Sequence, residues 1–383
     1  MENSVLDRYL KDLEYLVNID SAQDCPAGIC KVIDFFDAQF RDLGWFTSTV
    51  EVGAVAPCFV AVNRQQEKGK EHYDFYITGH MDTVFPKGTA SERPFSVDGN
   101  LLRGPGICDM KHGLLSTLYA IRSLNKAVLD KLNIIVLFQP DEEIGSPHSR
   151  TYMQEVGNKS DVCLVMEAAE NDDRPIHCIQ RKGMIKFRFI FTGKAGHAGS
   201  MFTNGAISAI TEMAYWMNAI MGLVNPEKET SANIGLVSGG TASNVIAEKA
   251  EMTGEIRYED MEEAKKAKAL IASLFEHAAA AGVRVEQPLD RFEPPMLPSE
   301  KTLEFVSFLQ KLAAEEGRDF TVRKRGGLSA ANFVSPFVPV CVDGMGPAGN
   351  GAHSMKEYLC RDSIGPDTDF LARILRLAAE AKN

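Results

Sequence analysis

Hydrophobic and polar positions along the chain follow two periods, one typical of buried strands and one typical of amphipathic helices. Short runs that are apolar on both faces occupy residues 58–62, 74–78, 133–139 and 162–166, with helical spacing between them. Strands of that kind, separated by helices, are typical of a mostly parallel sheet covered by helices on both sides. The pattern therefore predicts an α/β domain whose functional side chains collect beyond the carboxyl ends of the strands.

Helices are predicted on either side of these strands. Apolar residues recur at helical spacing after Ser4, a residue type favoured at N-caps, and again over residues 29–43, where Gly44 suits a left-handed C-cap. Toward the carboxyl end the pattern predicts a helix, a strand and a closing helix, over 302–315, 338–342 and 368–381.

The middle of the chain has a different pattern of apolar and polar positions. Apolar and polar side chains alternate over residues 184–193, as they do in a half-solvated strand. The elements that follow give the order β-α-β-β-α-β, at residues 184–193, 205–221, 233–237, 249–258, 261–279 and 283–286. This is the order of the ferredoxin-like α+β unit, which has an antiparallel sheet.

Chain length and prolines support a division into two domains. A chain of 383 residues exceeds one ordinary compact unit. Three prolines within residues 292–298 indicate a linker that returns from the middle segment. We therefore predict a discontinuous α/β catalytic domain, residues 1–182 and 294–383, interrupted by an inserted lid domain at residues 183–293.

Composition narrows the class of protein. Lys and Arg number 41 against 52 for Asp and Glu, a formal net charge of −11, so neither nucleic acid nor an anionic membrane is the expected partner. No apolar run approaches the roughly 20 residues that span a bilayer, and the first residues show no secretion signal. The eight cysteines form no C-x-x-C pair, so we expect reduced thiols in a cytoplasmic protein.

Histidine and carboxylate side chains follow several predicted strands and turns. They are His80 and Asp82, Asp109, Glu142 and Glu143, Glu167 and, near the carboxyl end, His353. Each one alone would indicate no more than a solvated turn, but together they fall at one edge of one predicted sheet. Imidazole and carboxylate without thiolate are ligands typical of zinc, cobalt or manganese. Two histidines and three carboxylates fit two ions about 3.5–4 Å apart that share one carboxylate, as in metal-assisted hydrolysis.

An ordered set of motifs along nearly the whole chain resembles a known family. The set comprises Gly79-His80-Met81-Asp82, Gly104-Pro105-Gly106 with Asp109-Met110-Lys111, Asp141-Glu142-Glu143, Glu167, the glycine-rich stretch 193–199 and His353. It is similar to the dizinc exopeptidases and deacylases, which include glutamate carboxypeptidase, acetylornithine deacetylase, succinyl-diaminopimelate desuccinylase and the aminoacylases. Glutamate carboxypeptidase is the nearest in pattern.

The resemblance implies a cofactor of two Zn²⁺ ions, with Co²⁺ or Mn²⁺ as substitutes. His80 and Glu167 are expected to hold one ion and Glu143 and His353 the other, with Asp109 as the bridge. A cis peptide bond is expected after Asp109.

The resemblance also implies roles for the side chains beside the ligands. Asp82 is expected to orient the His80 imidazole. Two adjacent glutamates cannot both point the same way, so Glu143 can bind metal while Glu142 acts as general base toward a water between the ions.

In the inserted domain, the resemblance assigns three residues to the substrate. His197 is expected to donate to the oxyanion across a dimer, and Asn244 and Arg257 to contact substrate, with Arg257 suited to a carboxylate. We therefore expect a homodimer formed through the lid domain. One departure from the family pattern is Ala330, which stands where an acid is usual and which affects the expected substrate pocket rather than the metal ligands.

These patterns predict a metal-dependent hydrolase that cleaves an amide bond of a small peptide or N-acyl-amino acid with a free carboxylate, in the manner of glutamate carboxypeptidase. The first alternative is an N-acyl-amino-acid deacylase of the acetylornithine deacetylase or aminoacylase type, with the same chemistry and a different pocket. An alternative of another class is a non-catalytic, metal-dependent peptide-binding protein. The presence of Glu142 beside the full ligand set argues against it.

Overall fold

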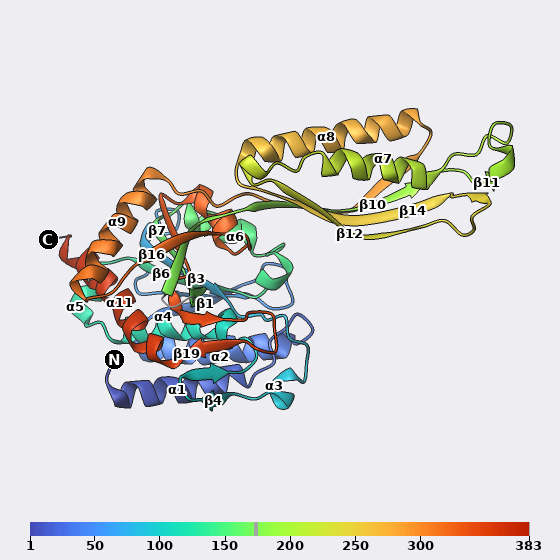
Figure 1. Cartoon of the computed structure of the whole chain (residues 1–383). Coiled ribbons are helices and arrows are strands. Elements are labelled where there is room, and N and C mark those ends of the chain that lie inside the picture. Colours follow the sequence, from blue (N-terminus) through green and yellow to red (C-terminus); the bar gives the residue numbers. More distant parts are fainter. Residues whose placement is uncertain (172–174, 383) are drawn as a thin grey trace. The chain divides into compact units, whose positions relative to one another are not determined.

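The computed structural model describes residues 1–171 and 175–382. The chain divides into two compact units, which we call unit 1 and unit 2 (Figure 1). Unit 1 comprises Met1–Gln180, Leu297–Arg325 and Ser329–Asn383, and unit 2 comprises Arg181–Met296 and Gly326–Leu328. Unit 2 is therefore inserted into the chain of unit 1.

Unit 1 is built on one large mixed sheet with the strand order β1-β2-β6-β3-β7-β17-β9-β8-β18-β19-β5-β4, and β16 pairs with β9. Its strands are β1 (Phe46–Val50), β2 (Cys58–Val62), β3 (Tyr73–His80), β4 (Ser96–Asp98), β5 (Leu101–Arg103), β6 (Ile134–Gln139), β7 (Ser160–Val165), β8 (Ala168–Asn171), β9 (Pro175–Arg181), β16 (Thr321–Arg325), β17 (Val340–Asp343), β18 (Gly346–Asn350) and β19 (Tyr358–Cys360). The central strands β6, β3, β7 and β17 run parallel, as predicted, and most outer pairs are antiparallel. The four apolar runs predicted as core strands form β2, β3, β6 and β7.

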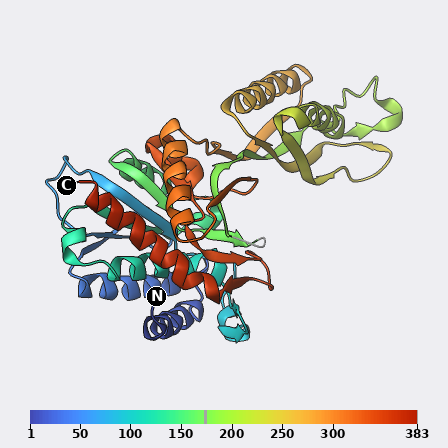
Figure 2. The same cartoon turned by 60° about the vertical axis from the view of Figure 1, so that its left-hand side comes forward.

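The helices of unit 1 cover this sheet. They are α1 (Asn3–Val17), α2 (Pro26–Asp42), α3 (Thr89–Glu92), α4 (His112–Arg122), α5 (Lys126–Leu129), α6 (Arg150–Gly157), α9 (Glu300–Glu315), α10 (Ala331–Val334) and α11 (Arg361–Glu380). Helix α4 contacts α1, α2, α11 and strand β3, and its residues from His112 to Ile121 are all buried. Figure 2 shows α11, in red, running across unit 1. One buried apolar cluster joins these helices to the sheet.

Unit 2 has the predicted β-α-β-β-α-β order. Its main elements are β10 (Gly183–Thr192), α7 (Ala209–Met221), β12 (Ser231–Gly239), β14 (Lys249–Tyr258), α8 (Met261–Ala280) and β15 (Arg284–Glu293), with a small ladder of β11 (Gly196–His197) and β13 (Val245–Ile246). The antiparallel sheet has the order β12-β14-β10-β15, and α7 and α8 lie on the same side of it (Figure 1). Phe187, Phe189 and Phe191 alternate along β10 and pack with Trp216 into the core.

Strand β15 corrects one predicted boundary. The sequence predicted a strand over 283–286 and a linker from residue 292, whereas β15 continues to Glu293. Pro288 interrupts the strand pattern because it has no N–H to donate. The fold accepts it because β15 is an edge strand, and its register against β10 shifts between Arg188 and Ile190.

Helix α11 corrects another boundary, because it begins at Arg361 rather than at residue 368. Its first turns contain Pro366 and several polar residues, so the spacing of apolar residues there did not indicate a helix. The helix N-cap before α1 is Glu2 rather than Ser4.

None of the eight cysteines is in a disulfide bond, as predicted, and only Cys30 is exposed. Among the described residues, no helix has both the length and the hydropathy needed to cross a bilayer.

Candidate active site

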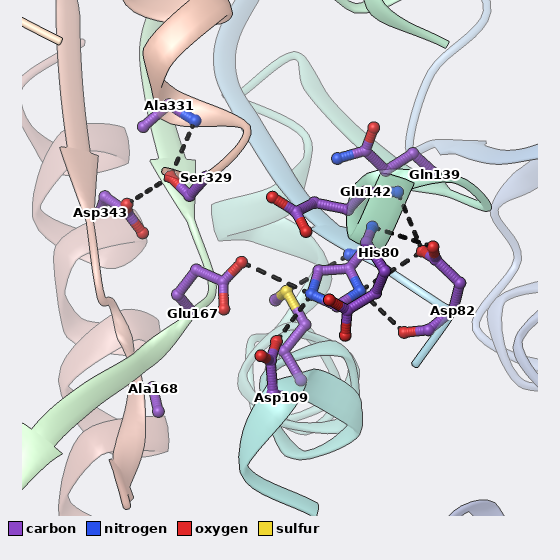
Figure 3. Close-up of polar contacts among 12 residues, drawn as sticks. His80, Asp82, Asp109, Gln139, Glu142, Glu167, Ala168, Ser329, Ala331 and Asp343 are labelled. Atoms are coloured by element: carbon purple, nitrogen blue, oxygen red, sulfur yellow. Dashed lines mark hydrogen bonds and ion pairs between the residues drawn. The ribbon is translucent and has the colours of Figure 1, made fainter. Parts of the chain in front are cut away.

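Three neighbouring strands of unit 1 deliver polar side chains to one edge of the sheet. His80 is the last residue of β3, and Glu167 follows the end of β7. Strand β6 ends at Gln139 and leads into the short turn η2 (Glu142–Ile144). Because β3 lies between β6 and β7 and all three run parallel, their carboxyl ends meet (Figure 3).

The five residues predicted as metal ligands come together. Asp109 Oδ1 lies 2.9 Å from His80 Nε2, and Asp109 Oδ2 lies 2.9 Å from His353 Nε2. On the first side, Glu167 Oε1 is 3.6 Å from His80 Nε2. On the second side, Glu143 Oε2 is 3.0 Å from His353 Nε2. The two oxygens of Asp109 thus face the two groups of side chains that the sequence assigned to different ions.

Most side chains of this cluster are buried, which is unusual for ionisable groups. The side chains of His80, Asp109, Glu143 and Glu167 are only 1%, 15%, 5% and 14% exposed, whereas His353 is 57% exposed. Glu143 Oε1 is buried and has no hydrogen-bond partner among the described residues. Donor atoms of His80, Asp109 and Glu143 lie within 4.8 Å of one another. Imidazole and carboxylate donors at this spacing, with one buried oxygen left over, fit a metal site.

The electrostatics of the cluster favour positive charge. Burial disfavours a charged imidazole at His80, but Asp109, Asp82 and Glu167 raise its pKa well above the ordinary value. Hydrogen bonds to Asp109 and Glu143 raise the pKa of His353 to about 11. Burial opposes ionisation of Asp109, but the two imidazoles lower its pKa. These shifts show that the carboxylates create a strongly negative potential between the histidines.

Glu142 lies beside this cluster without contacting an imidazole directly. Burial raises its pKa well above the ordinary value; His80 opposes this effect and Glu167 adds to it. Figure 3 shows its carboxylate pointing to the side of the site where Glu167 and His80 lie.

Asp82 lies against His80 through both its backbone and its side chain. The Nδ1 atom of His80 lies 2.9 Å from the backbone carbonyl oxygen of Asp82, and 3.4 Å from its carboxylate. The fully buried carboxylate also accepts the backbone N–H groups of Glu142, at 3.1 Å, and Glu143, at 3.0 Å. Asp82 therefore contacts the His80 ring with its carbonyl oxygen and its carboxylate, and the same carboxylate fixes the turn that carries both glutamates.

Sequence patterns gave no indication of two other residues near the site. Gln23 donates from Nε2 to Asp82 Oδ2, at 2.9 Å, and to the carbonyl of Pro140, at 2.7 Å. Glu357 is buried and accepts backbone N–H groups from the segment that contains Asp109. The peptide bond between Asp109 and Met110 is cis, as predicted.

The three residues assigned to substrate do not come together within one chain. His197 ends β11 beside Asn244, whose carbonyl accepts the N–H of Ala198, and both side chains are exposed. Arg257 lies eight residues along β14 from Lys249, which pairs with Thr192 close to the His197 end of the sheet. Eight residues of extended strand span about 26 Å. Arg257 donates to Glu255 Oε1 and to the carbonyl of Gly326, at 2.7 Å each.

Ala330 is buried, so its place is filled by packing rather than by a charge. The preceding residue, Ser329, donates to Asp343 Oδ2 at 2.7 Å, and both side chains are buried. An acid therefore does lie near this segment, but it comes from the end of β17.

An α/β sheet that gathers histidines and carboxylates at its strand ends defines a metal-dependent hydrolase. The chain belongs to peptidase family M20/M25/M40, whose model matches residues 76–377.

Two curated relatives match nearly the full length of the chain. Carboxypeptidase G2 from Pseudomonas sp. (strain RS-16) is 29% identical over 371 residues, which cover 96% of this chain and 88% of that protein. Acetylornithine deacetylase from Erwinia tasmaniensis is 25% identical over 365 residues, which cover 90% of each.

Solved structures agree on the fold. The aminopeptidase PepT of Bacillus cereus superposes with a TM-score of 0.78 at 23% identity, covering 97% of this chain and 99% of that one. The YXEP protein of Bacillus subtilis, described as a dinuclear metal binding peptidase from the M20 family, superposes with a TM-score of 0.69 at 18% identity, covering 99% of each chain.

Proposed function

We propose that this protein removes a carboxyl-terminal residue from a small peptide or an acylated amino acid by hydrolysing the amide bond, as a glutamate carboxypeptidase does. The observation that carries the proposal is the cluster in which Asp109 lies between His80 with Glu167 and His353 with Glu143. The likeness to carboxypeptidase G2 over most of both chains supports this choice of substrate class.

The cluster would hold two divalent cations, which we propose to be Zn²⁺, with Co²⁺ or Mn²⁺ as substitutes. His80 and Glu167 would bind one, Glu143 and His353 the other, and Asp109 both. Metal binding requires neutral imidazoles and ionised carboxylates, and the negative potential at the two histidines attracts a cation in place of their protons. When bound, such a pair lowers the pKa of a water and polarises an amide carbonyl.

Glu142 would then be the general base. Its backbone N–H is fixed by Asp82, so its side chain is held beside the cluster while the side chain of Glu143 turns into it. The Glu142 carboxylate would accept a proton from the attacking water and return it to the nitrogen of the leaving amine.

The position of the substrate-binding residues supports a homodimer formed through unit 2. His197 and Asn244 lie together near the Lys249 end of β14, and Arg257 lies eight residues, about 26 Å, along that strand from Lys249, which exceeds the reach of a small substrate. If all three contact one substrate, they must come from two copies of the chain. Arg257 would bind the substrate carboxylate after exchanging its contact with Glu255.

An N-acyl-amino-acid deacylase is the second candidate function. The likeness to acetylornithine deacetylase favours it, and the same side chains would perform the chemistry. We propose that Ala330, which lacks the acid usual at this position, changes the charge of the substrate pocket. We also propose a cytoplasmic location, which is supported by eight cysteines that form no disulfide bond.

Substitution of Glu142 tests the mechanism. In Glu142→Gln, we expect the metal content to remain as in the parent and kcat to fall about 10²–10⁴-fold, because general base catalysis is lost. Release of free amine from dipeptides with carboxyl-terminal glutamate and from N-acyl-amino acids is the assay. Glu155→Gln, an exposed change on α6, is the matched control.

Parental turnover in Glu142→Gln would remove Glu142 from the mechanism. A parent that binds metal yet cleaves neither class of compound would favour the non-catalytic binding protein.

A further inference from the structure

We propose that Glu357 is a positioning residue that holds the metal-bridging segment around Asp109 and the loop of His353 in a fixed relation. The inference rests on the proposed metal site, and it adds a residue to which the sequence patterns assigned no role. Glu357 touches neither imidazole of the cluster, so it acts through the backbone of its neighbours.

The Glu357 carboxylate accepts three backbone N–H groups from one short segment. Oε1 lies 2.8 Å from the nitrogen of Cys108 and 3.0 Å from that of Asp109, and Oε2 lies 3.1 Å from the nitrogen of Gly106. A carboxylate is suited to this place because both its oxygens only accept hydrogen bonds. A Gln side chain would turn an NH₂ group toward at least one of these N–H donors.

The same residue belongs to the turn that carries His353. The N–H of Glu357 donates to the carbonyl of Ser354, and the N–H of Ser354 donates to the carbonyl of Gly351. His353 itself lies at φ 62°, a left-handed conformation that this turn must maintain. Glu357 therefore links the turn of His353 to the backbone of the segment that contains Asp109, although the two are far apart in sequence. The side chains of His353 and Asp109 contact each other directly.

Burial indicates that this carboxylate is not an incidental surface charge. Glu357 is 0% exposed, and a buried carboxylate is costly unless hydrogen bonds and opposite charges compensate it. Arg93 Nη2 lies 3.9 Å from Oε2, and the buried Lys111 ammonium is also attracted to Glu357. The fold thus buries this carboxylate where three backbone N–H donors reach it.

The contact with Glu357 also determines which way the Asp109 side chain points. Its backbone has a non-helical conformation, φ −131° and ψ 89°, just before α4 begins. With the N–H fixed by Glu357, the two side-chain oxygens face His80 and His353. Loss of this anchor would let the segment relax, so the two oxygens would no longer be held between the two imidazoles.

Metal titration tests the proposal with a readout that does not depend on activity. Apo-protein is titrated with Zn²⁺, and with Co²⁺ followed by its absorption spectrum, in the parent, Glu357→Gln and Asp20→Asn. Asp20 is the matched control because its carboxylate also accepts two backbone N–H groups, those of Gly88 and Ala90, in a turn without predicted metal ligands. We expect Glu357→Gln to bind the ions about 10–100-fold more weakly, with a changed Co²⁺ spectrum, while Asp20→Asn binds as the parent does.

Parental affinity and spectrum in Glu357→Gln would overturn the proposal, as would equal weakening in Asp20→Asn. If circular dichroism shows that Glu357→Gln does not fold, Glu357→Asp replaces it, since the shorter side chain keeps the charge but cannot reach all three donors. The same two outcomes then decide. A parent that binds two ions but hydrolyses nothing would contradict the proposed activity and leave this comparison intact. A parent that binds no ion would overturn both.

Discussion

At the scale of single residues, the site depends on carboxylates that each contact two partners. Asp109 presents one oxygen to His80 and the other to His353. Asp82 accepts the N–H groups of Glu142 and Glu143, so one side chain fixes both glutamates in a turn where their side chains diverge. The sequence patterns placed Asp82 and the two glutamates just after strands, but the carboxylate-to-backbone contacts could not be predicted, because they depend on the path of the main chain.

His177 allows a residue-scale prediction about pH. Its ring is buried, stacks on Phe320 at 3.9 Å between ring centroids, and has Nδ1 2.8 Å from the carbonyl oxygen of Gly344. Burial lowers its pKa from 6.5 to about 4; the contact with Gly344 opposes this shift, and Arg318 and Arg325 add to it. In the unfolded chain, His177 therefore binds a proton below about pH 6.5, whereas in the folded protein it does so only near pH 4.

The contribution of His177 to the free energy of unfolding is fully present above pH 6.5. It is lost as the pH falls toward 4, and the total loss is about 3 kcal/mol. In His177→Asn, we expect the free energy of unfolding to fall less steeply over this range, although the variant is less stable at pH 7. Urea unfolding at several pH values measures the slope. An unchanged slope in His177→Asn would contradict the account.

At the scale of elements, the buried strands were the most predictable part of the fold. Each of the strands β2, β3, β6 and β7 contains a continuous apolar run, so the sequence predicts that both faces of these strands are buried. Strand β18 is the opposite case, because Gly-Pro-Ala-Gly-Asn is typical of a turn. It is a strand only because β8 and β19 pair with it, which is a tertiary effect that overrides local preference.

The same contrast applies to the loop after β18. His353 could be identified from the family motif, whereas Glu357, four residues later, carries no local signal. Its role becomes visible only when the segment at Gly106–Asp109 is placed against it.

At the scale of the whole molecule, the separation of His197 from Arg257 leads to a prediction about assembly. If His197 acts in the partner's site, a mixture of two inactive variants should regain activity. In a mixed dimer of His197→Ala and Glu142→Gln, one site has an intact Glu142 and receives an intact His197 from the other chain. Random mixing should restore about a quarter of parental activity, because half of the dimers are mixed and each has one complete site.

Light scattering on the parent establishes that dimers are present, and native mass spectrometry of the mixture shows by mass that mixed dimers have formed. Each variant alone, at the same total concentration, is the control. No recovery in proven mixed dimers would show that His197 does not act across the interface, and a monomeric parent would contradict the proposed assembly.

The central claim is that five side chains of unit 1 hold two divalent cations around Asp109. Crystals grown with excess Zn²⁺ and measured on both sides of the zinc absorption edge test it most directly. We predict two strong anomalous peaks, one beside His80 and Glu167 and one beside Glu143 and His353, each within bonding distance of a different oxygen of Asp109. A single peak, or peaks away from these residues, would contradict the account.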